Sequence, residues 1–257
     1  MVKAVNADRF NPLSPTTEKI ADGVWRHAGD VRRGMNVYLV EEEDGSGVFA
    51  FDSGTKMMAG GIRKAAEALG GLTRVVLGHS HVDHRGSAPK LGVPVYCHPD
   101  EVADAEGDGG AHYQPLGEVP VFYSRWLYRA TYPLWDGGPV EVAGTLSEGE
   151  RVAGFEVVHL PGHAPGQIGL WRESDRLCLS SDTVYLTDSM RPLGHHPGIY
   201  PPHPVFDKDP EQTLESVRRL AALEPEMVAP GHMEPLTGER SAVRSLLEQA
   251  ADDRTGW

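Results

Sequence analysis

Cysteine is scarce in this chain of 257 residues, which contains only Cys97 and Cys178. Both lie in short apolar runs typical of strands, so we expect buried free thiols and no disulfide. Free thiols are typical of a reducing compartment, and the sequence therefore favours a cytoplasmic protein. The chain also lacks a basic start followed by an apolar run, and it lacks any apolar stretch of membrane-spanning length. We therefore predict neither a signal peptide nor a membrane partner.

Positive charge is also in short supply. The chain has 24 Lys and Arg residues against 37 Asp and Glu residues, a formal net charge of -13. A nucleic-acid-binding surface needs an excess of Lys and Arg for the phosphates, so we expect a small-molecule substrate and no nucleic acid. A chain of this length can bury a core that is stable without disulfides. We predict a single domain over residues 1–257.

Histidine and aspartate, by contrast, are concentrated just after the apolar run Thr73 to Leu77, which predicts a buried strand. Within six positions the sequence places three imidazoles and one carboxylate, those of His79, His81, Asp83 and His84. Side chains two residues apart share a face of an extended segment, so His79 and His81 should point the same way. The last two ligands should follow in a tight loop that Gly86 supports. The cluster predicts a metal site with enough ligands for two ions.

The rest of the chain alternates predicted strands and helices, a pattern that favours a sheet covered by helices. We expect strands over Val24 to His27, Asn36 to Glu41, Gly47 to Asp52, Phe155 to Leu160, Gln167 to Arg172, Leu177 to Ser180 and Met227 to Ala229. We expect helices over Ala59 to Leu69, Asp209 to Glu224 and Thr237 to Ala251, the last on the surface and followed by a frayed tail. Further candidate ligands lie at or just beyond the ends of predicted strands, at Asp52, His163, Asp182 and His232. Asp52 either lies near the metal cluster or caps its own turn.

Aromatic residues make up only 7% of the chain, but many of them gather between Gly107 and Gly144. We expect a partly helical insertion there. It either packs on the body of the domain, covers the substrate site as a lid, or meets a second subunit in a homodimer. A second irregular stretch, Leu186 to Asp207, is rich in Pro and contains His195, His196 and His203. Loops of this length in compact domains are usually functional or mobile.

In their order along the chain, the candidate ligands resemble those of the metallo-β-lactamase superfamily. The resemblance covers about Ile20 to Gly238. The residues that carry the resemblance are His79, His81, Asp83, His84, His163, Asp182 and His232. The resemblance implies an α/β fold of the α+β type, a four-layer αββα sandwich with the metal site at one edge. It implies that His79, His81 and His163 hold one metal and that Asp83, His84 and His232 hold a second. Asp182 would bridge both metals, and Asp52 would lie behind the ligands.

The chemistry of these side chains agrees with that assignment. Three neutral imidazoles leave one open position on a tetrahedral metal, as in catalytic zinc sites. A bridging carboxylate holds two ions roughly 3.5–4 Å apart, the spacing of two-metal hydrolases. The ligand types favour two Zn²⁺ ions per chain, with Mn²⁺ or Fe as alternatives. The other histidines, His27, His98, His112 and His159, are expected to be surface or structural residues.

Two residues indicate the branch of the superfamily. Asp182 is similar to the bridging aspartate of the glyoxalase II-like and lactonase-like branches, which argues against β-lactam hydrolysis as the main activity. Tyr185 has the spacing of a lactonase tyrosine that contacts the substrate carbonyl, or it simply packs after the strand. The resemblance predicts a hydroxide between two metals that attacks an ester, lactone or thioester carbonyl. Asp83 would also pass a proton to the leaving group.

The sequence departs from the family pattern at Gly78, which precedes the cluster, and at Arg85 to Ser87, which follow it. Little chain remains after His232 for the C-terminal helical domain of glyoxalase II. Two alternatives from the same superfamily stay open. A mononuclear iron persulfide dioxygenase would need only His79, His163 and Asp182, whereas a small-molecule phosphodiesterase would use both metals. A non-catalytic scaffold would be expected to have lost at least one ligand.

Overall fold

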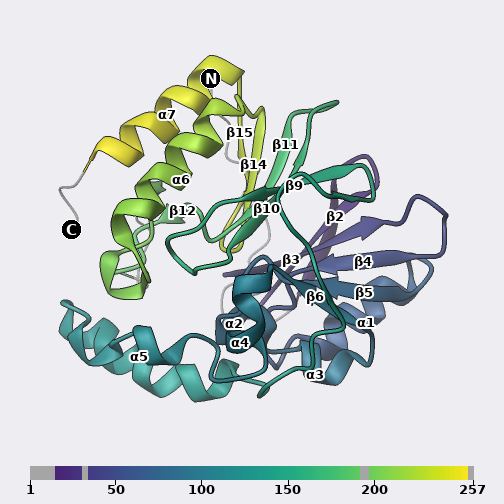
Figure 1. Cartoon of the computed structure of the whole chain (residues 1–257), viewed down its shortest axis with the longest axis horizontal. Helices are drawn as coiled ribbons and strands as arrows, with labels where there is room; N and C mark the ends of the chain where they lie inside the picture. The colour runs from purple at the N-terminus through teal and green to yellow at the C-terminus, as the bar shows by residue number, and fades with distance from the viewer. Residues whose placement is uncertain (1–14, 31–33, 192–196, 254–257) are drawn as a thin grey trace.

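The computed structural model describes residues 15–30, 34–191 and 197–253. Two β-sheets face each other, and helices lie outside both of them (Figure 1). The first sheet runs in the order β1 (Thr16–Ala21), β2 (Val24–Gly29), β3 (Met35–Glu41), β4 (Val48–Phe51), β5 (Leu72–Val76), β6 (Val95–Cys97) and β7 (Gly144–Thr145). The second runs in the order β15 (Leu236–Thr237), β14 (Met227–Pro230), β11 (Leu177–Ser181), β10 (Ile168–Arg172), β9 (Phe155–His159) and β8 (Arg151–Val152).

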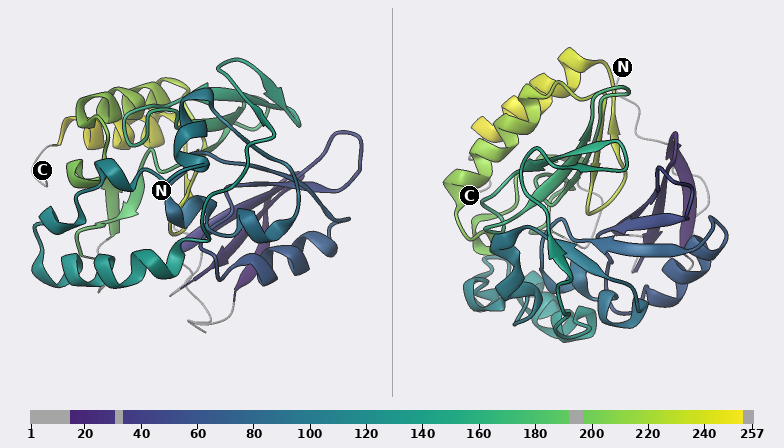
Figure 2. Two further views of the ribbon diagram at one scale, coloured as in Figure 1. Left: turned by 60° about the horizontal axis from the view of Figure 1, so that its bottom comes forward. Right: turned by 45° about the vertical axis from the view of Figure 1, so that its right-hand side comes forward.

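The helices complete a four-layer arrangement. In Figure 2 the helices α6 (Pro210–Ala222) and α7 (Arg240–Asp252), green and yellow, lie outside the second sheet, while α1 (Ala59–Glu67) and α3 (Ala88–Leu91), in blue, lie outside the first. The remaining helices are α2 (Val82–Arg85), α4 (Val102–Ala105) and α5 (Phe122–Trp135). The mixed α/β sandwich predicted from the sequence is therefore confirmed.

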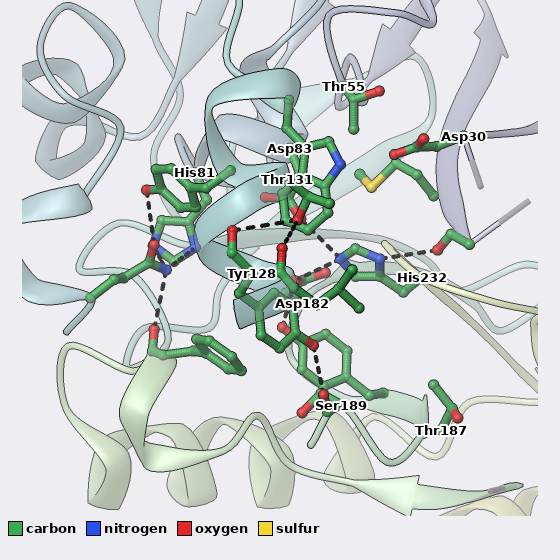
Figure 3. A pocket seen from close by; sticks show the side chains of 18 of the residues that line it. Asp30, Thr55, His81, Asp83, Tyr128, Thr131, Asp182, Thr187, Ser189 and His232 are labelled. Atoms are coloured by element: carbon green, nitrogen blue, oxygen red, sulfur yellow. Dashed lines mark hydrogen bonds and ion pairs between the residues drawn. The ribbon is translucent and has the colours of Figure 1, made fainter. Parts of the chain in front are cut away.

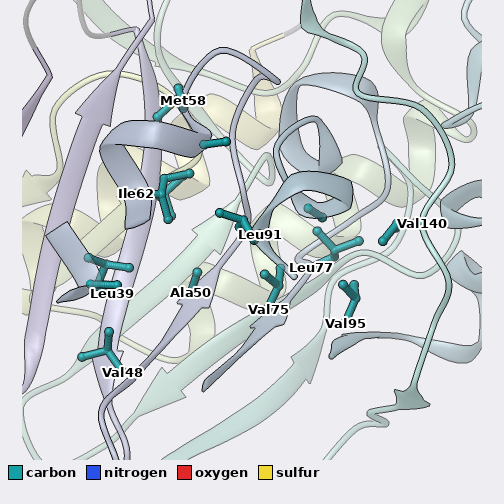
Figure 4. Packing of buried hydrophobic residues seen from close by; sticks show 14 of the residues in the cluster. Leu39, Val48, Ala50, Met58, Ile62, Val75, Leu77, Leu91, Val95 and Val140 are labelled. Atoms are coloured by element: carbon teal, nitrogen blue, oxygen red, sulfur yellow. The ribbon is translucent and has the colours of Figure 1, made fainter. Parts of the chain in front are cut away.

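Strand β4 shows why its sequence reads as a continuous apolar run. Val48 and Ala50 face the helices of the first outer layer, where they join the cluster around Ile62 (Figure 4). Phe49 and Phe51 point to the opposite face and fill the space between the two sheets. Because both faces are covered, all four side chains are buried. Each large apolar side chain removed from water in this way contributes roughly 1.5–3 kcal/mol to folding.

The parallel pairing of β4, β5 and β6 sends the carboxyl ends of these strands to one edge of the first sheet. In the second sheet β11 and β14 are also parallel, so their ends share an edge too. The two edges meet where Met35 forms a β-bridge with His232, and the backbone N–H of Asn36 donates to Gly231 O at 2.8 Å. Residues from both halves of the chain are thereby brought to one place.

The predicted elements agree with the structure to within a few residues, with several omissions and one correction. The strands β1, β7, β8 and β15, the short helices α3 and α4, and the small sheet of β12 (Tyr185–Thr187) and β13 (Pro197–Tyr200) were not predicted. The correction concerns Asp83 and His84, which lie on the short helix α2 and not in a tight loop. Gly86 has an ordinary helical φ of -55°. Glycine is needed at position 86 because a Cβ there would lie 2.3 Å from the carbonyl oxygen of Trp135.

Other expectations of the sequence can be compared directly. Cys97 and Cys178 are buried free thiols, as predicted, and burial raises the pKa of each to about 12. Helix α7 exposes one face to solvent and buries Val243 and Leu247 on the other. His195, His196 and most of the C-terminal tail lie outside the described residues. None of the helices in the described ranges is long and apolar enough to cross a membrane.

Candidate metal centre

The histidines and aspartates predicted as ligands converge at the edge where the two sheets meet. The loop after β5 carries His79 and His81, and α2 adds Asp83 and His84. From the second sheet, His163 follows β9, Asp182 follows β11 and His232 follows β14. Figure 3 shows His81, Asp83, Asp182 and His232 around a single pocket, although they come from distant parts of the sequence.

Among the groups of described side chains that have the spacing a metal ion requires, two consist entirely of predicted ligands. Each of His79, His81 and His163 offers one ligand atom within 4.8 Å of the others, and so does each of Asp83, His84 and His232. Asp182 lies between the groups. Its Oδ1 is 3.2 Å from His84 Nε2, and its Oδ2 is 3.2 Å from His232 Nε2 and 3.8 Å from His163 Nε2.

Hydrogen bonds behind the imidazoles fix which ring nitrogen faces the centre. His163 Nδ1 lies 2.8 Å from a carboxylate oxygen of Asp207, and His232 Nδ1 lies 3.0 Å from the carbonyl oxygen of Gly34. A carbonyl or carboxylate oxygen accepts a hydrogen bond and cannot donate one, so each Nδ1 carries the hydrogen. Nε2 is then the ring nitrogen that faces the centre, and its lone pair would be directed at a bound metal, as metal-binding imidazoles require.

Asp52 organises two further imidazoles from behind. Its carboxylate accepts from His84 Nδ1 at 2.9 Å, from the backbone N–H of Gly78 at 2.7 Å and from Ser181 Oγ at 2.8 Å. Because the Ser181 hydroxyl donates to Asp52, its oxygen is free to accept from His79 Nδ1, 3.1 Å away. Asp52 therefore lies behind the cluster, as the first of the two sequence interpretations had it.

Several polar atoms at the centre of the cluster are buried without a hydrogen-bond partner. They are Nε2 of His79, His84 and His163 and Oδ1 of Asp182. A buried polar atom without a partner costs roughly 1–3 kcal/mol. Divalent cations bound by the two groups of side chains would provide these atoms with partners. Imidazole nitrogen and carboxylate oxygen are suitable ligands for Zn²⁺ and for other first-row divalent metals.

The charges within the cluster also favour a bound cation. Burial by itself lowers the pKa of His232, but Asp182 and Asp83 raise that pKa to about 10. Asp182 shows the converse, because burial raises its pKa while His232 and His84 hold it well below its usual value. The pKa of His79 lies well below the usual range, first because of burial and then because of neighbouring imidazoles. The acids of the site therefore attract positive charge, and His79 stays neutral, as an imidazole must in order to coordinate a cation.

Tyr185 is buried over the cluster, and its hydroxyl donates to Asp182 Oδ2 at 2.8 Å. Its ring centroid lies 5.4 Å from that of His232 and 6.4 Å from that of His163. Burial, and then Asp182, raise the pKa of Tyr185 well above its usual value, so the hydroxyl keeps its proton. The side chain lines the same pocket as the candidate metal ligands.

Sequence reasoning missed a buried carboxylate that joins two of the loops carrying candidate ligands. Glu101 is fully buried, and its two carboxylate oxygens accept from the backbone N–H groups of Ser80 at 2.7 Å and Gly166 at 2.8 Å. Ser80 lies between His79 and His81, and Gly166 follows His163 by three residues. Asp207, which supports His163, was missed as well. Nothing in the local pattern around either acid separates it from an ordinary surface acid.

The remaining histidines lie away from the centre. His98 Nδ1 accepts from the backbone N–H of Asp100, and its ring stacks on that of His159 at 4.1 Å. His112 is exposed and pairs with Asp108. His27 is buried beside Thr17, and its Nε2 has no partner among the described residues. These positions agree with the surface or structural interpretation of all four.

The pocket in front of the cluster has a volume of about 440 Å³. The candidate ligands His81, Asp83, His163, Asp182 and His232 form one part of its lining. Helix α5, from the aromatic insertion, forms another part. Pockets of roughly 300–1,000 Å³ are typical of small-molecule sites.

Comparison with known proteins identifies the family. A model of the Metallo-beta-lactamase superfamily matches residues 31–232, and the chain belongs to this superfamily. It is 28% identical over 235 residues to the probable metallo-hydrolase YflN of Bacillus subtilis (strain 168), covering 84% of this chain and 86% of that one. It is also 28% identical over 248 residues to the probable metallo-hydrolase YqjP of the same organism, covering 84% and 71%.

Solved structures show the same fold. TTHA1623, in a di-iron-bound form, superposes with a TM-score of 0.57 at 26% identity, covering 88% of this chain and 94% of that one. A beta-lactamase domain protein from Burkholderia ambifaria gives a TM-score of 0.61 at 21% identity, covering 98% and 80%. The second likeness concerns the fold alone. Members of the superfamily bind metal ions, and the residues gathered here are suited to the same purpose.

Proposed function

We propose that this protein is a binuclear metal-dependent hydrolase that cleaves an ester, lactone or thioester of a small molecule. The observation that carries the proposal is the set of buried, unpartnered atoms at the centre, contributed by His79, His84, His163 and Asp182. The Asp182 carboxylate lies 3.2 Å from imidazoles of one group, those of His84 and His232, and 3.8 Å from His163 of the other, which supports a bridging role. The names of the Bacillus subtilis relatives, both probable metallo-hydrolases, support the reaction class.

The two metals would be held by His79, His81 and His163 on one side and by Asp83, His84 and His232 on the other, with Asp182 between them. Bound there, two divalent ions supply an activated water and stabilise negative charge on a carbonyl oxygen. Zinc is the metal that the ligand types favour, and iron is the principal alternative because TTHA1623 binds two iron ions.

The protein's own groups position the substrate and move the proton. Tyr185 keeps its hydroxyl hydrogen and faces the pocket, so it can donate to the carbonyl oxygen once that oxygen displaces the present bond to Asp182. Asp83 is partly exposed to the pocket and has a pKa of about 2, held down against burial by His84 and His232. It can accept a proton from the attacking water and return it to the leaving group.

The structure also bears on the dioxygenase alternative. A site that used only His79, His163 and Asp182 would leave His84 and His232 without a task. The Nδ1 atoms of both are nevertheless hydrogen-bonded from behind, to Asp52 and Gly34. Such support is typical of imidazoles that bind metal through Nε2, which favours the two-metal assignment.

Metal analysis combined with a substrate panel tests the proposal. Protein purified without chelator is expected to contain about two metal equivalents per chain and to hydrolyse at least one ester, lactone or thioester. Chelation should abolish turnover, and the added metal should restore it. A single iron per chain, with oxygen uptake on a persulfide, would identify the dioxygenase. Turnover of phosphodiesters or β-lactams alone would contradict the proposed substrate class.

Asp83→Asn tests the proton-transfer role separately. If both metals remain bound, we expect kcat to fall by about two orders of magnitude because the amide cannot carry the proton. Unchanged turnover in the metal-loaded variant would exclude the role. Asp44→Asn, on an exposed turn, is the matched control.

A further inference from the structure

One face of α5 forms a wall of the pocket. Its lining side chains are spaced at helical intervals and are Leu127, Tyr128, Thr131, Tyr132 and Trp135. Figure 3 shows Tyr128 and Thr131 around the pocket together with Asp83, Asp182 and His232. A substrate whose reacting carbonyl lies at the metal centre therefore extends its remaining atoms along this helix.

The helix is attached to the body on both sides of the pocket. Towards the second half of the chain, Ser124 Oγ donates to Met190 O at 2.7 Å and Tyr128 OH donates to Ser189 O at 2.6 Å. Towards the first half, the backbone N–H of Lys56 donates to Trp135 O at 2.8 Å. The wall is therefore formed by a helix held at both ends, and its inner face is pre-organised.

The hydroxyl groups on this face are already engaged within the protein. Tyr128 donates to Ser189 O, Tyr132 donates to Gln114 Oε1 at 3.0 Å, and Thr131 donates to the backbone carbonyl of Leu127 at 2.9 Å. With these donors occupied, the face presents rings and methyl groups to the cavity. Polar recognition of a substrate by this wall would require one of these bonds to break.

Apolar side chains also line the cavity away from the metal centre, among them Met35, Leu116, Phe206 and Met233. The charged residues in that part of the lining are Asp30 and Asp188, and no Lys or Arg is among the described residues there. An anionic group buried here would face carboxylates and, within the described lining, no cationic side chain, and it would lose its hydration without compensation. A neutral apolar group would instead gain from each methylene removed from water.

We propose that α5 and the apolar residues opposite it bind an aliphatic or aromatic substituent of the substrate that carries no negative charge. This inference rests on the proposed function, because the carbonyl must lie at the metals for the substituent to reach α5. It assigns the substrate class as lipophilic esters, lactones or thioesters without an anionic substituent, and it assigns Leu127 and its neighbours as specificity-determining residues.

Calorimetry with simple primary amides tests the inference without relying on turnover. The metal-loaded protein is titrated with butanamide, hexanamide, octanamide and the sulfonate analogue of octanamide, in which a sulfonate, a poor metal ligand, replaces the terminal methyl group. Affinity is expected to rise about fourfold per added methylene until the cavity is full. The sulfonate analogue is expected to bind at least about tenfold more weakly than octanamide because its anionic group would be buried without a partner.

Two variants of the same helix provide the structural test. Leu127→Asn changes the face that lines the pocket, whereas Leu134→Asn makes the same change on the exposed face, where Leu134 is 55% exposed. Both carry the same change in helix propensity, so loss of folding would affect both. We expect Leu127→Asn to weaken octanamide binding about tenfold or more, with little change for butanamide. Leu134→Asn should bind the whole series like the unchanged protein.

The possible results separate this inference from the proposed function. Length-dependent binding that Leu127→Asn abolishes supports the inference, even if no ester in the panel is hydrolysed. Hydrolysis without any dependence on chain length, or equal effects of the two variants, would overturn the inference and leave the hydrolase intact. Tighter binding of the sulfonate analogue than of octanamide would also overturn it, because it would show an anion-binding pocket.

Discussion

The hydroxyl of Ser181 donates a 2.8 Å hydrogen bond to Asp52 Oδ2, and both residues have a positive φ, 45° and 60° respectively. Asp52 follows β4 of the first sheet, and Ser181 ends β11 of the second. Non-glycine residues in this region are strained by of order 1–3 kcal/mol and persist where the surroundings impose them. Here the strained pair connects the two sheets directly behind two candidate ligands, His84 and His79.

We expect Asp52→Asn to weaken metal binding about tenfold to a hundredfold. The carboxylate accepts from His84, Gly78 and Ser181, whereas an amide has one oxygen and an NH₂ group that would face one of these donors. Metal dissociation constants measured against a competing chelator provide the test. The exposed Asp44→Asn variant is the control, and equal affinity in the two variants would show that Asp52 has no part in supporting the ligands.

Glu101→Gln should weaken metal binding and lower the free energy of unfolding by about 1–3 kcal/mol. One of the two backbone N–H groups, of Ser80 or Gly166, would meet the amide NH₂ in place of an acceptor. A purely structural role would change unfolding of the metal-free protein but leave the affinity for metal intact. Glu106→Gln is the matched control, because this exposed acid also accepts from a backbone N–H, that of Val142.

Tyr185→Phe should retain both metals and lower kcat by about tenfold or more, since a positioned donor to a developing oxyanion is lost. The expected change is in kcat and not in KM, because the bond strengthens as charge develops on the carbonyl oxygen. Metal content and steady-state kinetics are measured on the same preparation. Full activity of the metal-loaded variant would mean that Tyr185 only packs after the strand.

His27 gives a prediction about pH that does not involve the metal centre. Burial lowers the pKa of His27 to about 4 from 6.5. The unfolded chain therefore binds a proton that the folded protein does not bind between these values, and stability falls as the pH drops from 6.5 to 4. The shift corresponds to at most about 3 kcal/mol.

Urea unfolding of His27→Gln across this pH range should show a shallower loss of stability than the unchanged protein. The exposed His112→Gln variant should follow the unchanged protein. Parallel curves for all three proteins would exclude His27 as a source of acid sensitivity.

The sequence predicted the sheets and candidate ligands because these depend on short patterns. Apolar runs such as Val48 to Phe51 define strands, and His79 to His84 is dense enough in ligand types to be recognised without a structure. Glu101 and Asp207 could not be found in this way. Their partners lie far away in the sequence, and only the fold shows that one acid joins Ser80 to Gly166 and the other supports His163.

The β-bridge between Met35 and His232 has a consequence for the order of folding events. The candidate ligands come from both sheets, so the complete centre exists only after the two halves of the chain have docked. Docking brings together residues that are far apart in the sequence, and it therefore closes a loop that includes most of the chain. Metal binding should therefore act late, after the rate-limiting step of folding. It would slow unfolding and leave the folding rate nearly unchanged, so that the metals make the native state long-lived without helping the chain to reach it.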